Sequence, residues 1–391
     1  MKKKILFVLR SLYNGGAEKS LVNLLNELPE DKYDIDLLLF RNEGLYLQQV
    51  PKNVNIITPP HDEASLFASI KKPGKYFLLK IFSTIISRLI KKNTHLAGGY
   101  RWKYFYSKRL HNVSDKYDVA IGYTIGEVLY YIDEKVIANR KLVWVHNDYI
   151  TAGHPVAFNK PYFKNMDAIV TISDKCADIL KEVFPEFSNK IYNIPNITSS
   201  TVIRKRAEEF FPEEYQSLNC PCILSIGRLH PQKGFDMAIS AAAQLKRQGV
   251  RFKWYVIGNG TLEKSLRKQI KKENVEDCFI LLGVRENPYS YIKNCDFLVQ
   301  SSRYEGKSVV LDEAKILCKP IVATAYPTVK DQVEDGKEGL VVEMSPNGIA
   351  QGVKQMIENE VLRKNIEQYL SHHEYGNQNE VQKYMDLIDN V

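Results

Sequence analysis

The sequence predicts an α/β protein built from two Rossmann-like domains with parallel sheets. Short apolar runs alternate with longer amphipathic stretches along most of the chain, which is typical of βαβ units. The alternation is interrupted once, over residues 197–220, and starts again at Cys222. The length of 391 residues also exceeds a single core of ordinary size. We therefore expect the two sheets to face each other across a cleft that binds a ligand at the carboxyl ends of the strands.

The first domain is predicted to occupy residues 1–196. Its apolar runs predict strands at 4–9, 35–40, 54–57, 119–123, 141–146 and 168–173. Its amphipathic stretches predict helices at 17–28, 65–92, 100–114 and 174–184. A secretory signal is the alternative for the N-terminus, but Arg10 interrupts the short apolar run from Ile5 to Leu9. A buried first strand is therefore favoured.

The second domain is predicted at residues 221–370, after a linker at 197–220. Pro212 and the charged run at 204–209 show little hydrophobic periodicity, which indicates a linker. The strands of this domain are expected at 222–226, 251–257, 279–282 and 297–300, and near Ile321 and Leu340. Its helices are expected at 235–248, 262–272, 289–293 and 308–319. Residues 371–391 are predicted to form a C-terminal helix that crosses back to the first domain.

The bulk composition is that of an ordinary globular protein, with 44% hydrophobic and 26% charged residues. No apolar stretch reaches the length that a transmembrane helix needs. The six cysteines are scattered, and Cys220 and Cys222 are too close for a CxxC pair, so no structural zinc is expected. We interpret them as reduced residues of a cytoplasmic protein.

The positive charge is concentrated in one segment. The chain has a net charge of +8, whereas residues 64–112 contain no acid and carry eleven cations, which leaves 8 − 11 = −3 for the rest. A local field of this kind predicts an anionic partner on one face. The basic patch comprises Lys71, Lys72, Lys75, Lys80, Arg88, Lys91, Lys92, Arg101 and Lys103.

The same segment reads as an amphipathic basic helix over residues 75–92, followed by the aromatic residues Trp102, Tyr104 and Phe105. Helices of this composition lie on anionic membrane surfaces. The alternative is a helix whose apolar face packs on the core and whose basic face is exposed to solvent. Nucleic acid is disfavoured, because no recognition motif accompanies the charge. We expect contact with an anionic membrane surface.

The most informative motif is the stretch of residues 301–314, SSRYEGKSVVLDEA. It reads as strand, tight loop and helix, with Glu305 in the loop and Glu313 about one turn into the helix. A helix start suits a phosphate, because its N–H groups are unpaired and partially positive. A carboxylate on either side suits sugar hydroxyls. The loop therefore predicts a site for a sugar nucleotide. The alternative is that Glu305 is an ordinary surface residue and that Glu313 only complements the helix dipole.

Other glycine-bearing loops of the second domain also follow strands. Arg228 and Lys233 lie five positions apart on a loop that glycines bracket, where an arginine fork and a lysine point charge could clamp a diphosphate. Gly258 and Val284 lie on further loops that could pass close to a nucleotide. Ordinary turns and a solvated basic loop are the alternatives. The four loops together favour one shared nucleotide.

The first domain offers two candidates. Gly15 and Gly16 lie between the first strand and the first helix, where paired glycines let the backbone approach a ligand. His146 ends a strand, which would place it at the cleft. A simple turn and a structural histidine are the alternatives. The glycines do not form GxGxxG, so a nicotinamide or flavin site is disfavoured.

The motifs GGAEKSL, GRLHPQKGFDMAI, GNGTLEKSL and EGKSVVLDEA resemble those of the retaining GT-B glycosyltransferases of family 4, of the bacterial surface-polysaccharide type. The second domain matches almost throughout, and the first mainly at its glycine turn and His146. The resemblance implies that the first domain binds the acceptor and the second binds the nucleotide sugar. The resemblance implies a GT-B fold. The chain departs from the commonest EGFGL or EGFP pattern by having Lys307 and Ser308, which leaves the donor sugar open.

The resemblance also implies roles for single residues. Arg228 and Lys233 would hold the donor diphosphate and stabilise the leaving group. Glu305 would bind sugar hydroxyls, and Glu313 the ribose. Further contacts to the donor are implied for the backbone N–H groups of Lys307, Ser308 and Val309, for Gly15 and Gly16 near the diphosphate, for Gly258, for Val284 at the base, and for His146 near the reaction centre.

The chemistry implied is transfer of a hexose or N-acetylhexosamine from a nucleotide sugar, UDP rather than GDP, with retention and without a metal. We find no DxD motif placed at the cleft. The expected acceptor is a lipid-linked glycan of capsule, exopolysaccharide, O-antigen or teichoic acid, on the inner face of the cell membrane. The alternatives are a soluble small acceptor, a nonhydrolytic UDP-sugar epimerase on the same scaffold, and an inactive binding module.

Overall fold

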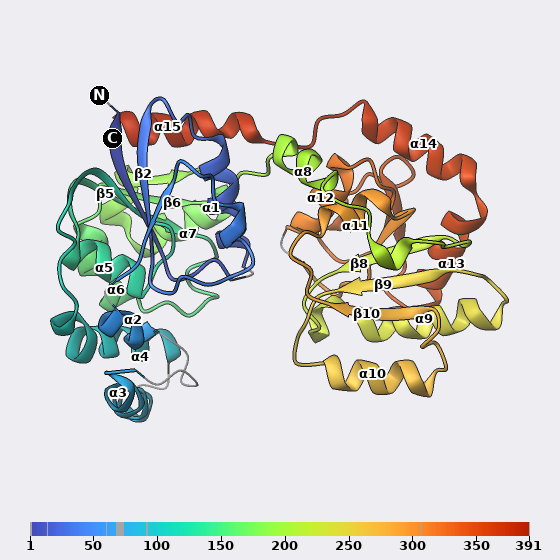
Figure 1. Cartoon of the computed structure of the whole chain (residues 1–391), viewed down its shortest axis with the longest axis horizontal. Coiled ribbons are helices and arrows are strands. Elements are labelled where there is room, and N and C mark those ends of the chain that lie inside the picture. The colour runs from blue at the N-terminus through green and yellow to red at the C-terminus, as the bar shows by residue number, and fades with distance from the viewer. Residues whose placement is uncertain are drawn as a thin grey trace. The chain divides into compact units, whose positions relative to one another are not determined.

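The computed structural model describes residues 2–13, 15–59, 61–67, 74–90, 93–305 and 307–390 (Figure 1). The chain divides into two compact units. The first contains Met1–Ile197 and Gln378–Val391, and the second contains Thr198–Asn377. Each unit has one sheet whose strand pairs are all parallel, with helices on both faces. The predicted α/β fold with parallel sheets is confirmed.

The sheet of the first unit has seven strands in the order β3-β2-β1-β4-β5-β6-β7. The strands are β1 (Lys3–Leu9), β2 (Tyr33–Leu39), β3 (Asn55–Ile57), β4 (Lys116–Gly122), β5 (Ile137–Val145), β6 (Ala168–Thr171) and β7 (Ile191–Asn193). The chain reverses its direction of winding between β1 and β4. In open parallel sheets, ligands bind outside the carboxyl ends of the strands at such a point.

The helices of the first unit are α1 (Gly16–Glu27), α2 (His61–Phe67), α3 (Phe77–Ile90), α4 (Thr94–Arg101), α5 (Glu127–Lys135), α6 (Val156–Lys164), α7 (Asp174–Val183) and α15 (Val381–Asn390). The helix expected at 65–92 is therefore two helices, α2 and α3, and part of the range lies outside the described residues. Helices α5 and α6 and strand β7 were not predicted from the sequence. A proline inside α6, Pro161, obscures its helical pattern.

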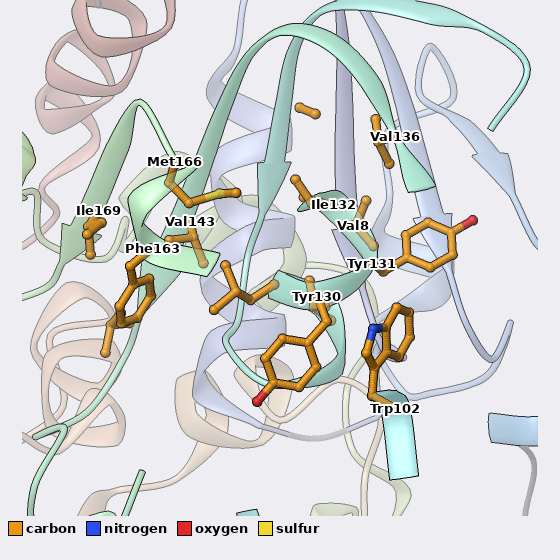
Figure 2. Packing of buried hydrophobic residues seen from close by; sticks show 14 of the residues in the cluster. Val8, Trp102, Tyr130, Tyr131, Ile132, Val136, Val143, Phe163, Met166 and Ile169 are labelled. Carbon is orange, nitrogen blue, oxygen red and sulfur yellow. The ribbon is translucent and has the colours of Figure 1, made fainter. Parts of the chain in front are cut away.

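Alternate residues of the strands form separate cores on the two faces of the sheet. In β1, Ile5 and Phe7 pack with α1 and α15, whereas Leu6 and Val8 pack on the opposite face with α5 and α7. Figure 2 shows part of this second core, in which Trp102 packs near Tyr130 and Tyr131 with ring centroids 6.0 and 6.2 Å away. The aromatic residues after α4 therefore belong partly to the core.

The sheet of the second unit has six strands in the order β10-β9-β8-β11-β12-β13. The strands are β8 (Cys222–Ile226), β9 (Lys253–Ile257), β10 (Phe279–Gly283), β11 (Phe297–Gln300), β12 (Ile321–Thr324) and β13 (Gly339–Val342). The helices are α8 (Ser200–Ala207), α9 (Phe235–Arg247), α10 (Glu263–Lys272), α11 (Tyr289–Asn294), α12 (Val309–Ile316), α13 (Pro346–Glu358) and α14 (Glu360–Ser371). The winding reverses between β8 and β11, so the loops after these two strands are where a ligand is expected.

The segment expected as a linker is part of the second unit from Thr198 onward. It forms α8, whose Ile203 and Ala207 are buried in a core with α11 and α12. This helix could not be recognised from hydrophobic periodicity, because few of its residues are apolar and most of its cations lie on the solvent side. The compact part of the second unit therefore begins before β8.

The C-terminal helix α15 belongs to the first unit. The Tyr384 ring is fully buried and stacks on Trp144 with centroids 5.6 Å apart. Arg140 donates hydrogen bonds to the carbonyl oxygens of Leu387 and Ile388, at 2.9 and 3.1 Å. These contacts close one face of the sheet, because α15 covers apolar side chains that β1 and β5 present there.

Candidate functional site in the second unit

The loops after β8 and β11 bring together two of the predicted site residues. Lys233 lies on the first loop and Glu305 on the second, and the Lys233 Nζ lies 2.5 Å from the Glu305 Oε1. The two side chains are only 16% and 7% exposed. Glu305 is therefore a largely buried, ion-paired group and not a solvated loop residue.

Further donors surround the Glu305 side chain. Ser302 Oγ donates to the same Oε1 at 2.6 Å, and Gln232 Nε2 donates to Oε2 at 3.3 Å. The backbone carbonyl of Glu305 accepts a hydrogen bond from Thr328 Oγ1 at 2.9 Å. Three side chains thus bind one carboxylate and fix its direction. Ser302, Gln232 and Thr328 were not predicted as site residues, because the sequence around each gives no signal that distinguishes it from other polar residues.

The loop after β8 is fixed to the loop after β11 by its last glycine. Gly234 has a φ of +64°, and a Cβ there would lie 2.0 Å from the carbonyl oxygen of Ser301. Ser301 Oγ donates to the Lys233 carbonyl at 2.8 Å. Arg303 binds both carboxylate oxygens of Asp236, at 2.8 and 2.6 Å. The close backbone contact requires glycine, and it places Lys233 against the second loop.

The start of α12 is held by a glutamine from further along the chain. The Ser308 N–H donates to Gln332 Oε1 at 2.7 Å, and Gln332 Nε2 donates back to the Ser308 carbonyl at 3.0 Å. Ser308 Oγ donates to Gln300 Oε1 at 2.8 Å. The expectation that the Ser308 N–H contacts a ligand is therefore not met by this conformation, because that N–H is already bonded to Gln332.

Glu313 and Lys307, two further charged residues of this motif, differ in exposure. Glu313 is buried, with 1% of its surface exposed. Lys307 is 73% exposed and lies 3.4 Å from Asp312, measured from Nζ to Oδ2. Val309 is the first residue of α12 and is 38% exposed. Lys307 therefore points to solvent from the same loop that holds the buried Glu305.

The remaining glycine loops lie beside the loop after β8. Gly258 has a φ of +147°, and a Cβ there would lie 2.0 Å from the Gly227 carbonyl oxygen. The Gly258 N–H donates to the carbonyl of Gly283, the residue before Val284, at 2.8 Å. Arg228 is exposed on this edge, and its guanidinium makes no ion pair with any residue that the structure describes. The structure thus gathers all four loops at one edge of the sheet.

In the first unit, Gly15 and Gly16 begin α1. Gly15 is the N-cap residue, and a Cβ there would lie 2.0 Å from Glu18 Oε2. Burial raises the pKa of the Glu18 carboxyl. A Cβ added at Gly16 would meet no atom within 4 Å, so the space beside this helix start is open.

His146 follows β5 and lies largely buried. Its Nε2 lies 2.8 Å from the Tyr123 carbonyl oxygen, so Nε2 carries the proton that it donates there. Burial lowers the pKa of the imidazole to about 4. The ring is therefore neutral near pH 7, and it can act there as a hydrogen-bonding group but not as a cation.

The basic patch of the first unit is less uniform than its sequence. Lys71, Lys72, Lys91 and Lys92 lie outside the described residues. Lys75 is paired with Asp62, an acid just outside the segment, at 2.6 Å. Arg88 and Lys103 are exposed, whereas Lys80 and Arg101 are half-buried. The patch thus divides into an exposed set and a set that faces inward.

Helix α3 (Phe77–Ile90) carries several large apolar side chains on a solvent-exposed face. Leu78, Phe82, Ile85 and Leu89, which share one face of the helix, are 77%, 57%, 54% and 81% exposed. The buried positions of the helix are instead Ser83 and Ser87. A helix of a soluble domain ordinarily shows the opposite arrangement. No helix among the described residues has the length and apolar content to cross a bilayer.

The described residues contain no group of three or more His, Cys, Asp or Glu placed to hold a metal ion.

Residues 207–373 match the family model described as glycosyl transferases group 1. A curated relative, the N-acetylgalactosamine-N,N'-diacetylbacillosaminyl-diphospho-undecaprenol 4-alpha-N-acetylgalactosaminyltransferase of Campylobacter jejuni, is 37% identical over 144 residues. That alignment covers 36% of this chain and 39% of the relative, so the chain spans well under half of the relative's length.

Two solved structures share the fold of the whole chain. Anabaena HepE in complex with UDP-glucose has a TM-score of 0.64 at 17% identity, with 100% of both chains covered. Staphylococcus aureus TarM, in a complex that contains UDP, has a TM-score of 0.64 at 16% identity, with 99% of this chain and 100% of that chain covered. The chain has the GT-B glycosyltransferase fold, and its residues 207–373 match the family model of the glycosyl transferases group 1.

Proposed function

We propose that the protein is a glycosyltransferase that moves a hexose or N-acetylhexosamine from a nucleotide sugar to a glycan acceptor. The observation that carries this proposal is the pairing of Lys233 with Glu305 at the point where the winding of the second sheet reverses. A cation and a carboxylate side by side suit the diphosphate and the hydroxyls of one donor. The match of residues 207–373 to the group 1 family model supports the same activity.

The donor is proposed to be a UDP-sugar, bound by the loops of the second unit. Arg228 and Lys233 would bind the diphosphate, and their positive charge would stabilise it as the leaving group. Glu305 would accept hydrogen bonds from sugar hydroxyls, and Glu313 would bind the ribose. Solved relatives with UDP or UDP-glucose bound support this choice of nucleotide.

The reaction is proposed to proceed with retention and without a metal. The bond between the anomeric carbon and the diphosphate oxygen breaks, and the acceptor oxygen bonds to that carbon from the same face. The acceptor proton passes to the departing phosphate. Glu305 is not assigned as a nucleophile, because its carboxylate is already held by Lys233 and Ser302.

The acceptor is proposed to be a lipid-linked glycan of a surface polysaccharide, reached from the inner face of the cell membrane. The Campylobacter jejuni relative is named for a substrate linked through a diphosphate to undecaprenol. The outward apolar face of α3 supports membrane contact, because Phe82 and Leu89 would leave water on binding. Exposed Arg88 on the same helix would pair with anionic lipid headgroups.

The activity can be tested by incubating the purified chain with a panel of UDP- and GDP-sugars and a lipid-diphosphate-linked N-acetylhexosamine. We expect one UDP-sugar to be consumed only when the acceptor is present, with an α-linked product from an α-linked donor by NMR. Conversion of the sugar without acceptor would identify an epimerase instead. No consumption of any donor with any acceptor would contradict the proposal.

A further inference from the structure

A cavity of about 320 Å³ lies in the first unit, at the carboxyl ends of β1 and β4. Arg10 follows β1, and the loop at Gly126 follows β4. Helix α4 contributes Arg101 and His95, and the segment before α6 contributes His154. This is the point where the winding of the first sheet reverses, so its position matches that of the donor loops in the second unit. Nothing in the proposed donor chemistry uses this cavity.

The cavity has an excess of positive charge. Among the described residues that line it, Glu127 is the one carboxylate, and its Oε2 lies 3.5 Å from Arg10 Nη1. Arg101 adds a second cation, and its Nη1 lies 3.5 Å from Ser87 Oγ, a weak contact that leaves the guanidinium free to bind a ligand. An anion in this cavity would therefore be attracted by two guanidinium groups at once.

The backbone adds to this preference. Helix α5 begins after Gly126, which has a φ of +82° and no side-chain cap. The N–H groups at the start of that helix are unpaired within it and carry partial positive charge. A Cβ added at Gly126 would meet no atom within 4 Å, so a ligand has room to approach the helix start.

Neutral hydrogen-bonding groups lie beside the cations. The rings of His95 and His154 pack with centroids 4.4 Å apart. Burial lowers the pKa of His154 to about 4, and the adjacent His95 adds to the shift, so the His154 ring is neutral near pH 7. Its Nε2 lies 3.3 Å from Asn147 Oδ1 and donates to it, which leaves Nδ1 as an acceptor for a ligand hydroxyl. The cavity thus combines groups for an anion with groups for a sugar.

We infer that this cavity binds a sugar carrying a phosphate or diphosphate, with Arg10 and Arg101 at the phosphate oxygens and His154 at a sugar hydroxyl. Arg101 also contacts Ser87, a residue on the inner face of α3, whose outer face carries the exposed apolar side chains. A lipid-linked diphosphate would therefore fit both features of the α3–α4 pair. The assignment of this ligand as the acceptor rests on the proposed glycosyltransferase function.

The test is a calorimetric titration of the full chain with farnesyl-diphosphate-linked N-acetylglucosamine, with its soluble methyl-diphosphate-linked analogue and with UDP. Arg10→Gln and Arg101→Gln are each expected to lower the affinity for both sugar phosphates by about tenfold. UDP binding, which uses the second unit, is expected to stay unchanged. Lys181→Gln on α7, an exposed lysine outside the cavity, is the matched control.

Unchanged binding of both sugar phosphates in the arginine variants, or no binding by the wild type, would overturn the inference. Tighter binding of the farnesyl compound assigns the site to a lipid-linked ligand, and equal binding assigns it to any sugar phosphate. Failure of the proposed function is a separate result, namely that UDP and UDP-sugars do not bind at all. Each single variant measures the contribution of one arginine to binding, so one variant still tests the inference if the other fails to fold.

Discussion

Lys233 and Glu305 bind each other in the second unit, with the ammonium nitrogen 2.5 Å from one carboxylate oxygen. The sequence assigned the two residues to different parts of one donor. A donor phosphate would therefore either share the Lys233 ammonium group with the Glu305 carboxylate or take the place of that carboxylate beside Lys233. Because both side chains are largely buried, removing either partner alone leaves the other charge without compensation. Glu305 therefore positions Lys233 in addition to any contact with the sugar.

Gly258 should tolerate no side chain. Its φ of +147° and the 2.0 Å approach of a Cβ to the Gly227 carbonyl oxygen both oppose alanine. We expect Gly258→Ala to destabilise the protein by about 2–4 kcal/mol, measured as a lower midpoint of thermal unfolding. Gly249→Ala is the control, since Gly249 also has a positive φ, +76°, but open space around it. Equal losses in the two variants would show that the backbone contact is unimportant.

Protonation of His146 should destabilise the first unit in mild acid. Its pKa is lowered to about 4 in the folded chain, whereas an unfolded histidine has the ordinary value of about 6.5. Between these values the unfolded state binds more protons, so stability falls as the pH falls from about 6.5 to about 4. The contribution is on the order of 3 kcal/mol.

His146→Gln should lose less stability over that pH range than the wild type. The measurement is the urea midpoint at pH 7 and at pH 4.5 for both proteins. The carboxylates that also titrate in acid are the same in the two chains, so their effect cancels in the comparison. Parallel loss of stability in the two proteins would mean that folding does not lower the pKa of His146.

The exposed face of α3 should anchor the protein to anionic vesicles. We expect the wild type to float with vesicles that contain phosphatidylglycerol. Replacing Leu78, Phe82, Ile85 and Leu89 by Gln should reduce the floated fraction about tenfold or more, because this substitution removes most of the apolar area that would enter the interface. A wild type that stays with the soluble fraction, or a variant that floats equally well, would rule out this anchor.

A matched control uses exposed apolar residues from elsewhere. Ile137, Phe211 and Val361 are 52%, 53% and 69% exposed and lie away from α3. Replacing these three by Gln changes surface hydrophobicity without changing the helix. This control should float as the wild type does.

Much of the fold followed from hydrophobic periodicity. The alternation of apolar runs and amphipathic stretches predicted both parallel sheets, since burial on both faces selects the same side chains in every strand. The misses have local causes. Pro161 lies inside α6, β7 has only three residues, and α8 is formed by a charged run that resembles a linker.

The site was predictable in part, because glycine loops after strands can be recognised one by one. Contacts between loops could not be predicted. Glu305 and Lys233 are 72 positions apart, and the Gln332 side chain that occupies the Ser308 N–H comes from 24 positions later. The cavity of the first unit was missed for the same reason. Arg10, His95 and His154 come from three separate segments, and none belongs to a motif.

The second unit is proposed to bind the diphosphate of a nucleotide sugar through Lys233. The most direct measurement is a calorimetric titration of UDP in the presence of EDTA, on the wild type, Lys233→Met and the control Lys271→Met, an exposed lysine of α10. We expect the wild type and the control to bind UDP equally, and Lys233→Met to bind about tenfold to a hundredfold more weakly. Equal affinity of Lys233→Met and the wild type would contradict the account.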